Sequence, residues 1–459
     1  MKCPPKTETI VAPNGKGCAF LMEMGTGKTL TTIAVMGRAY LDSKINKVLV
    51  VCPTSIMNVW ETELNTYADF PVCATVLTGS GAKRTQPLQN QGWPGLWVAI
   101  INYEATWRVI KDLIEWAPDM VVYDESQRIK THNAAQSKAC HKISDATPYR
   151  MILTGTPVQN SPADFFSQYR AIDKTVFGTS FVAFRNRYVM MGGYGNHQVV
   201  GYKNLSELTQ KAHSIAFRCT KEEALDLPEQ VFINRVVELE PEAKGVYKSL
   251  VDESIAELEA GDITATNVLT KLLRLQQMTG GFVNTDDGKT LEVSTAKMDA
   301  LEEIIDDTQD AGKKLVIFAR FIAEIDAIRK LLGKKKIPFG FIAGEVAMNE
   351  RGEEVRRFQN DPKCQVFVAQ IQTAGLGITL TAADTAVFYS LDFNYANYSQ
   401  ALARIHRIGQ RNTCTYIHLM AKGTVDTKVM AALTKKEAIA KEVVDNWRDF
   451  FKGGPAWPE

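Results

Sequence analysis

A glycine-rich loop between an apolar run and a helical pattern constrains the fold of this chain most. The stretch LMEMGTGKTL covers residues 21–30, overlaps the apolar run CAFLME at 18–23, and leads into the helical pattern KTLTTIAVMGRAY. The full phosphate-loop pattern is G-x-x-x-x-G-K-[ST], and Met22 stands where its first glycine is expected. The order strand, loop, helix is the context in which such a motif binds phosphate. A plain glycine-rich turn is the alternative.

The residues of this loop have the chemistry that a phosphate site needs. Around Thr26, Gly25 and Gly27 allow the backbone to turn its N–H groups inward, and the helix N-terminus adds partial positive charge. We expect Lys28 to reach the β- and γ-phosphates of a nucleotide and Thr29 to hold Mg²⁺. The missing first glycine affects the entry to the turn and none of these contacts.

Two carboxylates follow a second apolar run, VVYDES at 121–126. Asp124 at the strand end can hold Mg²⁺ through water, and Glu125 can orient and deprotonate an attacking water. An Asp-Glu pair by itself is more often part of a solvated surface. A metal-bound nucleotide at Lys28 requires such a pair, so the two motifs support each other.

A third strand-end motif, LTGTPVQN, covers residues 153–160. Its hydroxyl groups, on Thr154 and Thr156, are expected near the carboxylates, and Gly155 permits a close backbone approach. A simple turn broken by Pro157 is the alternative.

Apolar runs alternate with helical patterns in two regions, which predicts an α/β fold with parallel sheets covered by helices. The runs that predict strands lie at 18–23, 47–53, 96–101, 120–126 and 149–155 in the first region and at 314–320, 364–370, 385–390 and 415–420 in the second. Between these regions, residues 160–290 are mainly helical in pattern, with a Gly-rich loop or hairpin at 190–204 and a linker near 286–294. The predicted boundaries are a tail at 1–17, a first lobe at 18–160, a helical insertion and linker at 161–290, a second lobe at 291–440, and a tail at 441–459.

Composition excludes several classes of protein. The net charge of +1 argues against a generally basic nucleic-acid coat but leaves room for a local basic cleft. The eight cysteines have no C-x-x-C spacing, which favours a reducing compartment over a zinc site or disulfide framework. No signal peptide and no run of 18 apolar residues is present. We therefore expect a cytoplasmic protein with no membrane partner.

Two arginines stand three residues apart in QALARIHRIGQ at 400–410. On one helix face, Arg404 and Arg407 could both meet a γ-phosphate as arginine fingers. An amphipathic helix with a charged outer face is the alternative.

The motifs together resemble the superfamily two helicase-like ATPases, specifically the Swi/Snf-type DNA translocases. The similarity extends from about residue 18 to 440, and its most specific stretches are GLGITLTAAD and RIHRIGQ. It implies two RecA-like lobes with a helical insertion between them. It also implies ATP and Mg²⁺ as cofactors and double-stranded DNA as the track. Further implied site residues are Gln410 with the nucleotide, Thr154, Thr156, Thr373, Gly375 and Gly377 in coupling, and Pro53, Thr54, Asn102 and Arg351 at the DNA.

The chain departs from the family pattern at two places. Gln127 stands where the family usually has histidine, and glutamine can hydrogen-bond across the cleft but cannot titrate, so the departure concerns coupling. The upstream stretch TETIVAPNGKGCAF contains no glutamine, although the family uses one there to recognise adenine.

The resemblance predicts an ATP-driven motor that moves along duplex DNA largely independently of sequence. A strand-separating helicase is the first alternative, and a binding scaffold with a decayed ATPase is the second. We expect a monomeric, compact bacterial or phage member whose partners are double-stranded DNA and proteins bound to it.

Overall fold

The chain folds into two compact units, which a computed structural model describes over residues 17–89, 94–192, 198–259, 265–284, 290–346, 348–376 and 378–444. One unit comprises Met1–Asp226 and Lys436–Glu459, and the other comprises Leu227–Lys435. The helical insertion predicted at 161–290 is thus divided between the units, and the linker predicted near 286–294 lies inside the second. Of the predicted tails, only Gly17 and residues 441–444 fall within the described chain.

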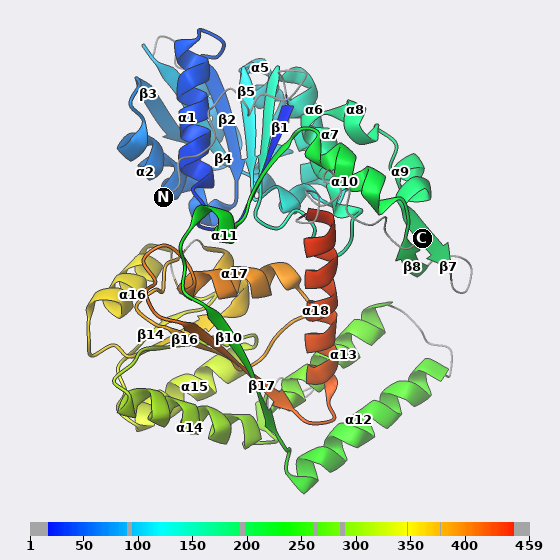
Figure 1. Ribbon diagram of the computed structural model, residues 1–459, viewed down its shortest axis with the longest axis vertical. Coiled ribbons are helices and arrows are strands. Elements are labelled where there is room, and N and C mark those ends of the chain that lie inside the picture. The colour runs from blue at the N-terminus through cyan, green and yellow to red at the C-terminus, as the bar shows by residue number, and fades with distance from the viewer. Residues whose placement is uncertain are drawn as a thin grey trace. The chain divides into compact units, whose positions relative to one another are not determined.

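The first unit is built on a parallel sheet whose described strands follow the order β3-β4-β2-β5-β6-β1-β9 (Figure 1). All five strands expected from the sequence are present. The strands are β1 (Gly17–Met22), β2 (Lys47–Cys52), β3 (Val72–Val76), β4 (Leu96–Asn102), β5 (Met120–Asp124), β6 (Tyr149–Leu153) and β9 (Ala216–Cys219). The two strands at the edges, β3 and β9, were not predicted.

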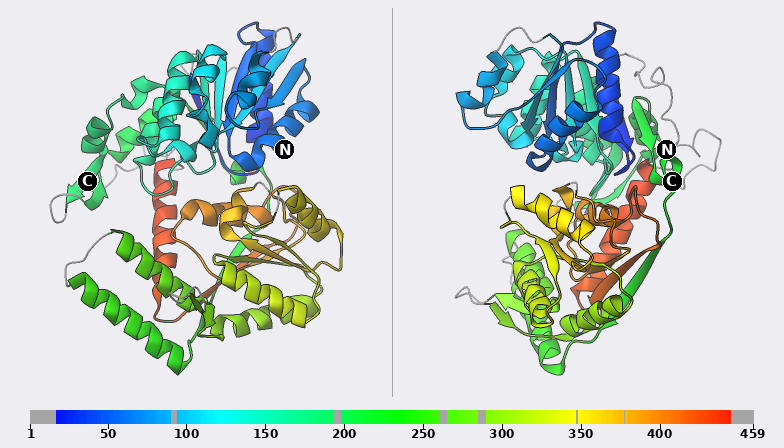
Figure 2. Two further views of the ribbon diagram at one scale, coloured as in Figure 1. Left: turned by 180° about the vertical axis from the view of Figure 1, so that it is seen from behind. Right: turned by 90° about the vertical axis from the view of Figure 1, so that its left-hand side faces the viewer.

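Helices cover both faces of this sheet, as the two views in Figure 2 show. On β2, Val48 and Val50 belong to one hydrophobic core, and Leu49 and Val51 belong to the core on the opposite face. A strand buried on both faces has no polar side to expose, which explains the continuous apolar runs. The first core receives α1 (Lys28–Leu41) and α2 (Met57–Tyr67), and the second receives α5 (Ile110–Glu115), α6 (Ala135–Ala146), α7 (Asp164–Ile172) and α10 (Leu205–His213).

Residues after α7 extend the second core with an aromatic cluster. The ring of Phe177 lies 5.3 Å from that of Phe184, and the latter lies 4.8 Å from Tyr188. The segment contains α8 (Lys174–Phe177), α9 (Phe181–Tyr188) and the antiparallel pair β7 (Val189–Gly192) and β8 (Gln198–Tyr202). The Gly-rich loop or hairpin predicted at 190–204 therefore contains a hairpin, whose residues 193–197 lie outside the description.

The second unit contains a parallel sheet whose described strands follow the order β10-β17-β16-β13-β15-β14. Four of its strands were expected from the sequence. The strands are β10 (Gln230–Val237), β13 (Leu315–Ala319), β14 (Phe339–Ile342), β15 (Val366–Gln370), β16 (Thr385–Phe388) and β17 (Cys414–Ala421). The edge strand β10 was missed because it lacks a buried apolar run: Phe232 is 51% exposed and Val236 is 53% exposed.

The helices of this unit are described over seven segments. They are α12 (Pro241–Glu259), α13 (Ala265–Thr279), α14 (Ala296–Asp310), α15 (Ile322–Lys334), α16 (Met348–Asn360), α17 (Tyr395–Ile405) and α18 (Val425–Val444), the last of which continues into the first unit. A short antiparallel pair, β11 (Phe282–Asn284) and β12 (Thr290–Glu292), follows α13. No helix of the described chain is both long enough and apolar enough to span a bilayer.

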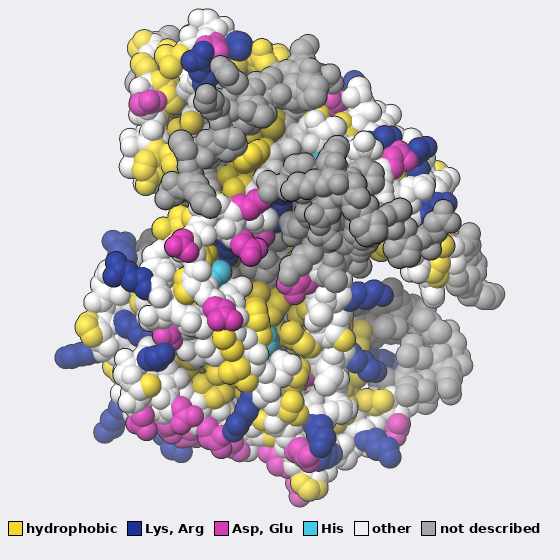
Figure 3. Space-filling model, viewed as in Figure 1, with side chains coloured by type: hydrophobic (Ala, Val, Ile, Leu, Met, Phe, Trp, Pro, Cys, Tyr) yellow, Lys and Arg dark blue, Asp and Glu magenta, His cyan; other side chains and the backbone are white. Residues whose placement is uncertain are grey.

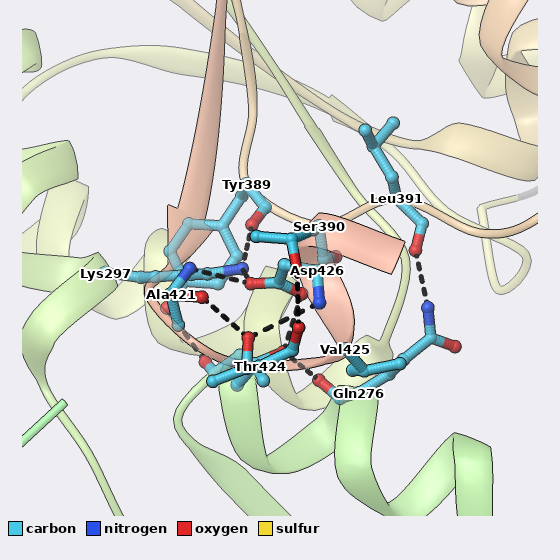
Figure 4. A network of polar contacts seen from close by, with 12 residues as sticks. Gln276, Lys297, Tyr389, Ser390, Leu391, Ala421, Thr424, Val425 and Asp426 are labelled. Carbon is cyan, nitrogen blue, oxygen red and sulfur yellow. Dashed lines mark hydrogen bonds and ion pairs between the residues drawn. The ribbon is translucent and has the colours of Figure 1, made fainter. Parts of the chain in front are cut away.

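A buried polar network ties α13, α14 and α18 to the end of β16 (Figure 4). Lys297 Nζ lies 2.7 Å from Asp426 Oδ2 and donates to the carbonyl oxygen of Tyr389 at 3.2 Å. Thr279 Oγ1 donates to Asp426 Oδ1 at 2.9 Å. Because the ammonium is buried, removing its carboxylate partner would leave an uncompensated charge in the interior.

A second buried carboxylate, on Glu324, makes the stability of this unit depend on pH. Its Oε2 accepts hydrogen bonds from Phe321 N and Ser390 Oγ, and burial raises its pKa from 4.5 to about 7. Between these two pKa values the folded state binds more protons than the unfolded state, so stability falls as pH rises through this window. Glu324→Gln removes the titration, and we expect it to raise the unfolding temperature relative to wild type more at pH 8 than at pH 5.

The expected change in that difference corresponds to about 2.5 kcal/mol, because the rise from pH 5 to the folded pKa of about 7 covers nearly two pKa units, each worth roughly 1.4 kcal/mol. Thermal denaturation at both pH values measures it. Glu353→Gln, at an exposed position, is the matched control. An equal effect of Glu324→Gln at the two pH values would contradict the prediction.

Candidate functional site

The predicted nucleotide motifs of the first unit all follow the carboxyl ends of its strands. The phosphate loop follows β1, the Asp-Glu pair ends β5, and LTGTPVQN follows β6. These strands are neighbours and run parallel, so their carboxyl ends meet at one edge of the sheet. That edge is where open α/β sheets bind ligands.

The phosphate loop has a backbone that glycine favours. Gly25 has φ of 85° and Gly27 has φ of 90°, both in the left-handed region. Gly27 precedes α1, which begins at Lys28, so the unpaired N–H groups of the first helical turn face the loop. The hydroxyl of Thr26 donates to the carbonyl oxygen of Glu23 at 2.8 Å and closes the turn. Thr29 follows Lys28 in the same helical turn, half-buried.

The ammonium of Lys28 lies inside this loop. It donates to the carbonyl oxygens of Met22 at 2.9 Å and Glu23 at 3.2 Å. Burial lowers the pKa of Lys28, while the charges of Glu125 and Asp124 act in the opposite direction. An ammonium, helix N-terminal N–H groups, a threonine hydroxyl and two carboxylates form a donor set that fits a nucleotide with Mg²⁺.

Asp124 is buried and held from two sides. Trp60 Nε1 donates to its Oδ2 at 2.8 Å, and Glu125 N donates to its Oδ1 at 2.9 Å. Burial, together with the neighbouring charge of Glu125, raises the pKa of Asp124 to about 7. Tyr103 OH donates to its backbone carbonyl at 2.8 Å. Nothing in the sequence pattern around Trp60 pointed to this hydrogen bond.

Glu125 is connected to the motif after β6 by a chain of hydrogen bonds. Gln127 Nε2 donates to Glu125 Oε2 at 2.5 Å, and Thr154 Oγ1 donates to Gln127 Oε1 at 2.7 Å. Thr156 N donates to Thr154 Oγ1 at 3.0 Å. Both ends of the Gln127 amide are therefore used, one as donor and one as acceptor. We call these four residues the Gln127 relay.

Gly155 lies against the phosphate loop, as a close approach requires. A Cβ built there would lie 3.2 Å from Met24 N and 3.3 Å from Met22 O. A side chain at this position would press on the loop, so the relay and the phosphate loop are packed directly together.

The base of the loop is fixed by contacts that the sequence did not reveal. Buried Arg218, on β9, donates to the carbonyl oxygen of Leu21 at 2.8 Å and lies 3.1 Å from Glu23 Oε1. Lys221 N donates to Glu23 Oε2 at 2.9 Å. Since β9 was not predicted, nothing in the sequence placed Arg218 beside a loop almost 200 positions earlier.

The predicted DNA-contacting residues of this unit lie at the same strand edge. Pro53 and exposed Thr54 follow β2, and Asn102 ends β4, the neighbouring strand. Asn102 Oδ1 accepts a hydrogen bond from Arg84 Nη1 at 2.8 Å. The hydroxyl and amide groups suit contacts with a sugar-phosphate backbone.

In the second unit, the structure brings Arg404 and Arg407 to one carbonyl oxygen. The Nη1 atom of each donates to Ile378 O at 3.2 Å. The expectation that both arginines lie on one helix face is wrong, because α17 ends at Ile405 and Arg407 lies in the turn beyond it. The turn ends at Gly409, with φ of 101°.

Gln410 was expected at the nucleotide, but its amide has other partners. Its Nε2 donates to the carbonyl oxygens of Ala383 at 2.8 Å and Ile405 at 3.2 Å. Its Oε1 accepts from Arg411 N at 2.9 Å and Asn412 N at 3.0 Å. These contacts inside the second unit indicate that Gln410 shapes the turn after Arg407.

Two further predicted residues of this unit donate hydrogen bonds to nearby backbone carbonyl oxygens, and the other two are glycines. Arg351 Nε donates to Val346 O at 2.8 Å, and Thr373 Oγ1 donates to Gln370 O at 2.6 Å. Gly375 lies within the 3-10 helix Ile371–Leu376, whereas Gly377 is not among the described residues. Thr373 thus follows β15 at the carboxyl edge of the second sheet.

Comparison with known families gives two matches. The SNF2-related domain matches residues 11–280, and the helicase conserved C-terminal domain matches residues 296–409. The first match alone covers more than half of the chain.

Individual relatives are similar over almost the whole chain. An uncharacterised ATP-dependent helicase of Mycoplasma genitalium is 26% identical over 94% of this chain and 40% of its own length. A RAD54-like DNA repair and recombination protein of Gallus gallus is 26% identical over 95% of this chain and 65% of its own length. The chain spans less than half the length of the Mycoplasma protein and less than two thirds of the RAD54-like protein.

A solved structure is also similar. The Sulfolobus solfataricus SWI2/SNF2 ATPase core in complex with double-stranded DNA is 27% identical, with coverage of 94% of this chain and 89% of that chain and a TM-score of 0.42.

Proposed function

The chain belongs to the SNF2-related family, and we propose that it hydrolyses ATP to move along double-stranded DNA, largely without regard to sequence. The observation that carries this proposal is the placement of Lys28, Asp124 and Glu125 at one strand edge, with Glu125 connected to Thr154 through the Gln127 relay. Proteins similar to this chain include one named as an ATP-dependent helicase and one named as a DNA repair and recombination protein.

The residues of the first unit divide the work of hydrolysis. Lys28 and the N–H groups at the start of α1 would hold the phosphates, and Thr29 and Asp124 would hold the metal. Bound Mg²⁺ supplies charge neutralisation on the phosphate oxygens. Glu125 takes the proton of the attacking water, and Gln127 orients its carboxylate through Oε2. Arg404 and Arg407 are proposed as the arginine fingers that stabilise negative charge on the transferring phosphoryl group.

Movement requires that DNA contact and hydrolysis influence each other. Thr54 and Asn102 bind backbone phosphates at the strand edge that also carries the hydrolysis residues. The Gln127 relay then transmits changes between LTGTPVQN and Glu125. Backbone contacts carry no base information, so binding is independent of sequence and weakens with salt.

The charge on the surface of the second unit limits the places where DNA can bind. Acidic side chains gather over α14 in Figure 3, including Glu302 and Asp306, which pair with Lys335. A phosphate backbone would be repelled there. DNA therefore binds elsewhere on this unit, and we propose contacts from Thr373, in the 3-10 helix Ile371–Leu376, and from Arg351, near the start of α16.

The test is the ATPase rate measured side by side with single-stranded DNA, duplex DNA and RNA. We expect a severalfold rise with duplex DNA. No stimulation by any nucleic acid would contradict the proposal. A binding scaffold with a decayed ATPase predicts that outcome together with intact DNA binding.

A strand-separating helicase is the second candidate, because the β7–β8 hairpin could act as a wedge. Val199 and Val200 on β8 are 53% and 61% exposed. Triplex displacement and forked-duplex unwinding assays separate the candidates. The translocase proposal expects triplex displacement with little unwinding, whereas equal efficiency in both assays, lost in Val200→Ser, would favour the helicase.

A further inference from the structure

A bridge of polar side chains crosses the carboxyl end of β2. Arg128, in the 3-10 helix Ser126–Ile129 after β5, places Nη1 2.9 Å from Glu104 Oε1 in α4 (Tyr103–Thr106). Asn102 at the end of β4 donates from Nδ2 to Glu104 Oε2 at 2.9 Å. Strand β2 lies between β4 and β5 in the sheet (Figure 1). The Arg128–Glu104 ion pair, which joins residues after β5 and β4, therefore spans the end of β2.

The position of the bridge is supported by a residue of β2 itself. Burial raises the pKa of the Cys52 thiol, and the charges of both Arg128 and Glu104 act on that thiol. Cys52 is the last residue of β2 and directly precedes Pro53 and Thr54, the segment proposed to contact DNA. The ion pair therefore lies beside that segment.

The bridge has the donors of a phosphate site, but a carboxylate uses them. Glu104 accepts from a guanidinium with one oxygen and from an amide with the other, as a phosphate could. A further guanidinium, on Arg84, donates to Asn102 Oδ1 at 2.8 Å. The Arg128 and Glu104 side chains are 46% and 48% exposed, so solvent and a ligand can reach both. An ion pair this exposed stabilises the fold little and can be exchanged.

We propose that Glu104 occupies the place of a DNA backbone phosphate in the free protein, and that a phosphate displaces it to bind Arg128 and Asn102. The inference rests on the proposed function, because it takes duplex DNA as the ligand. Glu104 then opposes DNA binding and is an autoinhibitory contact. If Glu104 instead only oriented Arg128 toward DNA, removing its charge would weaken binding.

Displacement of Glu104 from Arg128 by a phosphate would also affect the hydrolysis residues. Arg128 N donates to Glu125 O at 3.0 Å, and Gln127 of the relay directly precedes Arg128. A phosphate that pulls on Arg128 therefore acts on the turn that carries Glu125.

The experiment is a double-mutant cycle between Glu104→Gln and Arg128→Gln, with binding to a short duplex measured by fluorescence anisotropy at several salt concentrations. The glutamine at 104 keeps the size of the side chain and removes its charge at an exposed position. Glu115→Gln, at the exposed end of α5 before β5 begins, is the matched control at the opposite edge of the sheet. Thermal unfolding checks that each variant is folded.

We expect Glu104→Gln to tighten binding by roughly two- to fivefold when Arg128 is present, and to have no effect when it is absent. The DNA concentration for half-maximal ATPase stimulation should fall in the same proportion. Arg128→Gln should weaken binding and reduce the dependence of log K on log salt by about one unit. Glu115→Gln should bind as wild type does.

Each other result overturns the inference. Unchanged or weaker binding of Glu104→Gln shows that Glu104 does not compete with phosphate. If Glu104→Gln tightens binding equally when Arg128 is replaced, or if Glu115→Gln also tightens binding, the effect is general charge repulsion only. If the wild-type protein binds duplex DNA and one of these results is found, the proposed function stands, whereas absence of duplex binding by wild type overturns both.

Discussion

Glu125→Gln is expected to lower the ATP hydrolysis rate by roughly 10²–10⁴-fold, the usual contribution of a general base. The amide keeps the shape of the side chain, and its oxygen can still accept the hydrogen bond that Gln127 Nε2 donates to Oε2. It cannot take a proton from the attacking water. Steady-state phosphate release with saturating duplex DNA measures the rate, and equilibrium binding of ATP should be retained.

Lys28→Ala provides the contrast for this experiment. Lys28 Nζ lies between the carbonyl oxygens of Met22 and Glu23 in the phosphate loop, so its loss should impair both ATP binding and hydrolysis. Glu115→Gln, at the opposite edge of the sheet from the phosphate loop, should leave ATP binding and hydrolysis intact. Hydrolysis by Glu125→Gln near the wild-type rate would show that another group accepts the proton.

The central strands and the residues at their ends could be predicted from the sequence because burial and topology act locally there. Strand β2 is buried on both faces and reads as an unbroken apolar run. Parallel strands also place their carboxyl ends together, so Lys28, Asp124 and Thr154 could be brought to one edge without knowledge of any long-range contact.

The edge strands could not be predicted in the same way. Most of β10 is exposed, and β3 is only half-buried along its length, so neither shows the burial pattern of a central strand. Their place in the sheet depends on pairing with β17 and β4, and sequence periodicity does not encode these partners. Missing β9 for this reason also meant missing Arg218.

The partners of the catalytic residues were equally hidden. Trp60 is 1% exposed and packs in the core, so its pattern gave no reason to expect a hydrogen bond with Asp124. For Gln127, the sequence predicted hydrogen bonding without titration but not which groups it joins. Only the fold shows that Glu125 and Thr154 lie at the two ends of its amide.

Arg407→Ala is expected to reduce the hydrolysis rate by about 10³-fold or more, which is the range for arginine fingers. Arg407 lies in the turn after α17, half-buried, and Nη1 holds Ile378 O at 3.2 Å. A guanidinium that stabilises charge only in the transition state should affect kcat much more than ATP affinity. Single-turnover rates and equilibrium ATP binding, measured on the same preparation, separate the two effects.

Arg404→Ala is expected to affect stability as well as the hydrolysis rate, because Arg404 is 3% exposed and part of the packed interior of its unit. Its removal should lower both the unfolding temperature and the hydrolysis rate, whereas Arg407→Ala should lower the rate with little change in unfolding temperature.

Exposed Arg411, four residues after Arg407, offers Arg411→Ala as a control for lost positive charge. If Arg407→Ala and Arg411→Ala slow hydrolysis equally, net charge of this loop is responsible and Arg407 is not a finger. If Arg407→Ala loses rate only in proportion to a lower unfolding temperature, its role is structural, through the carbonyl it shares with Arg404.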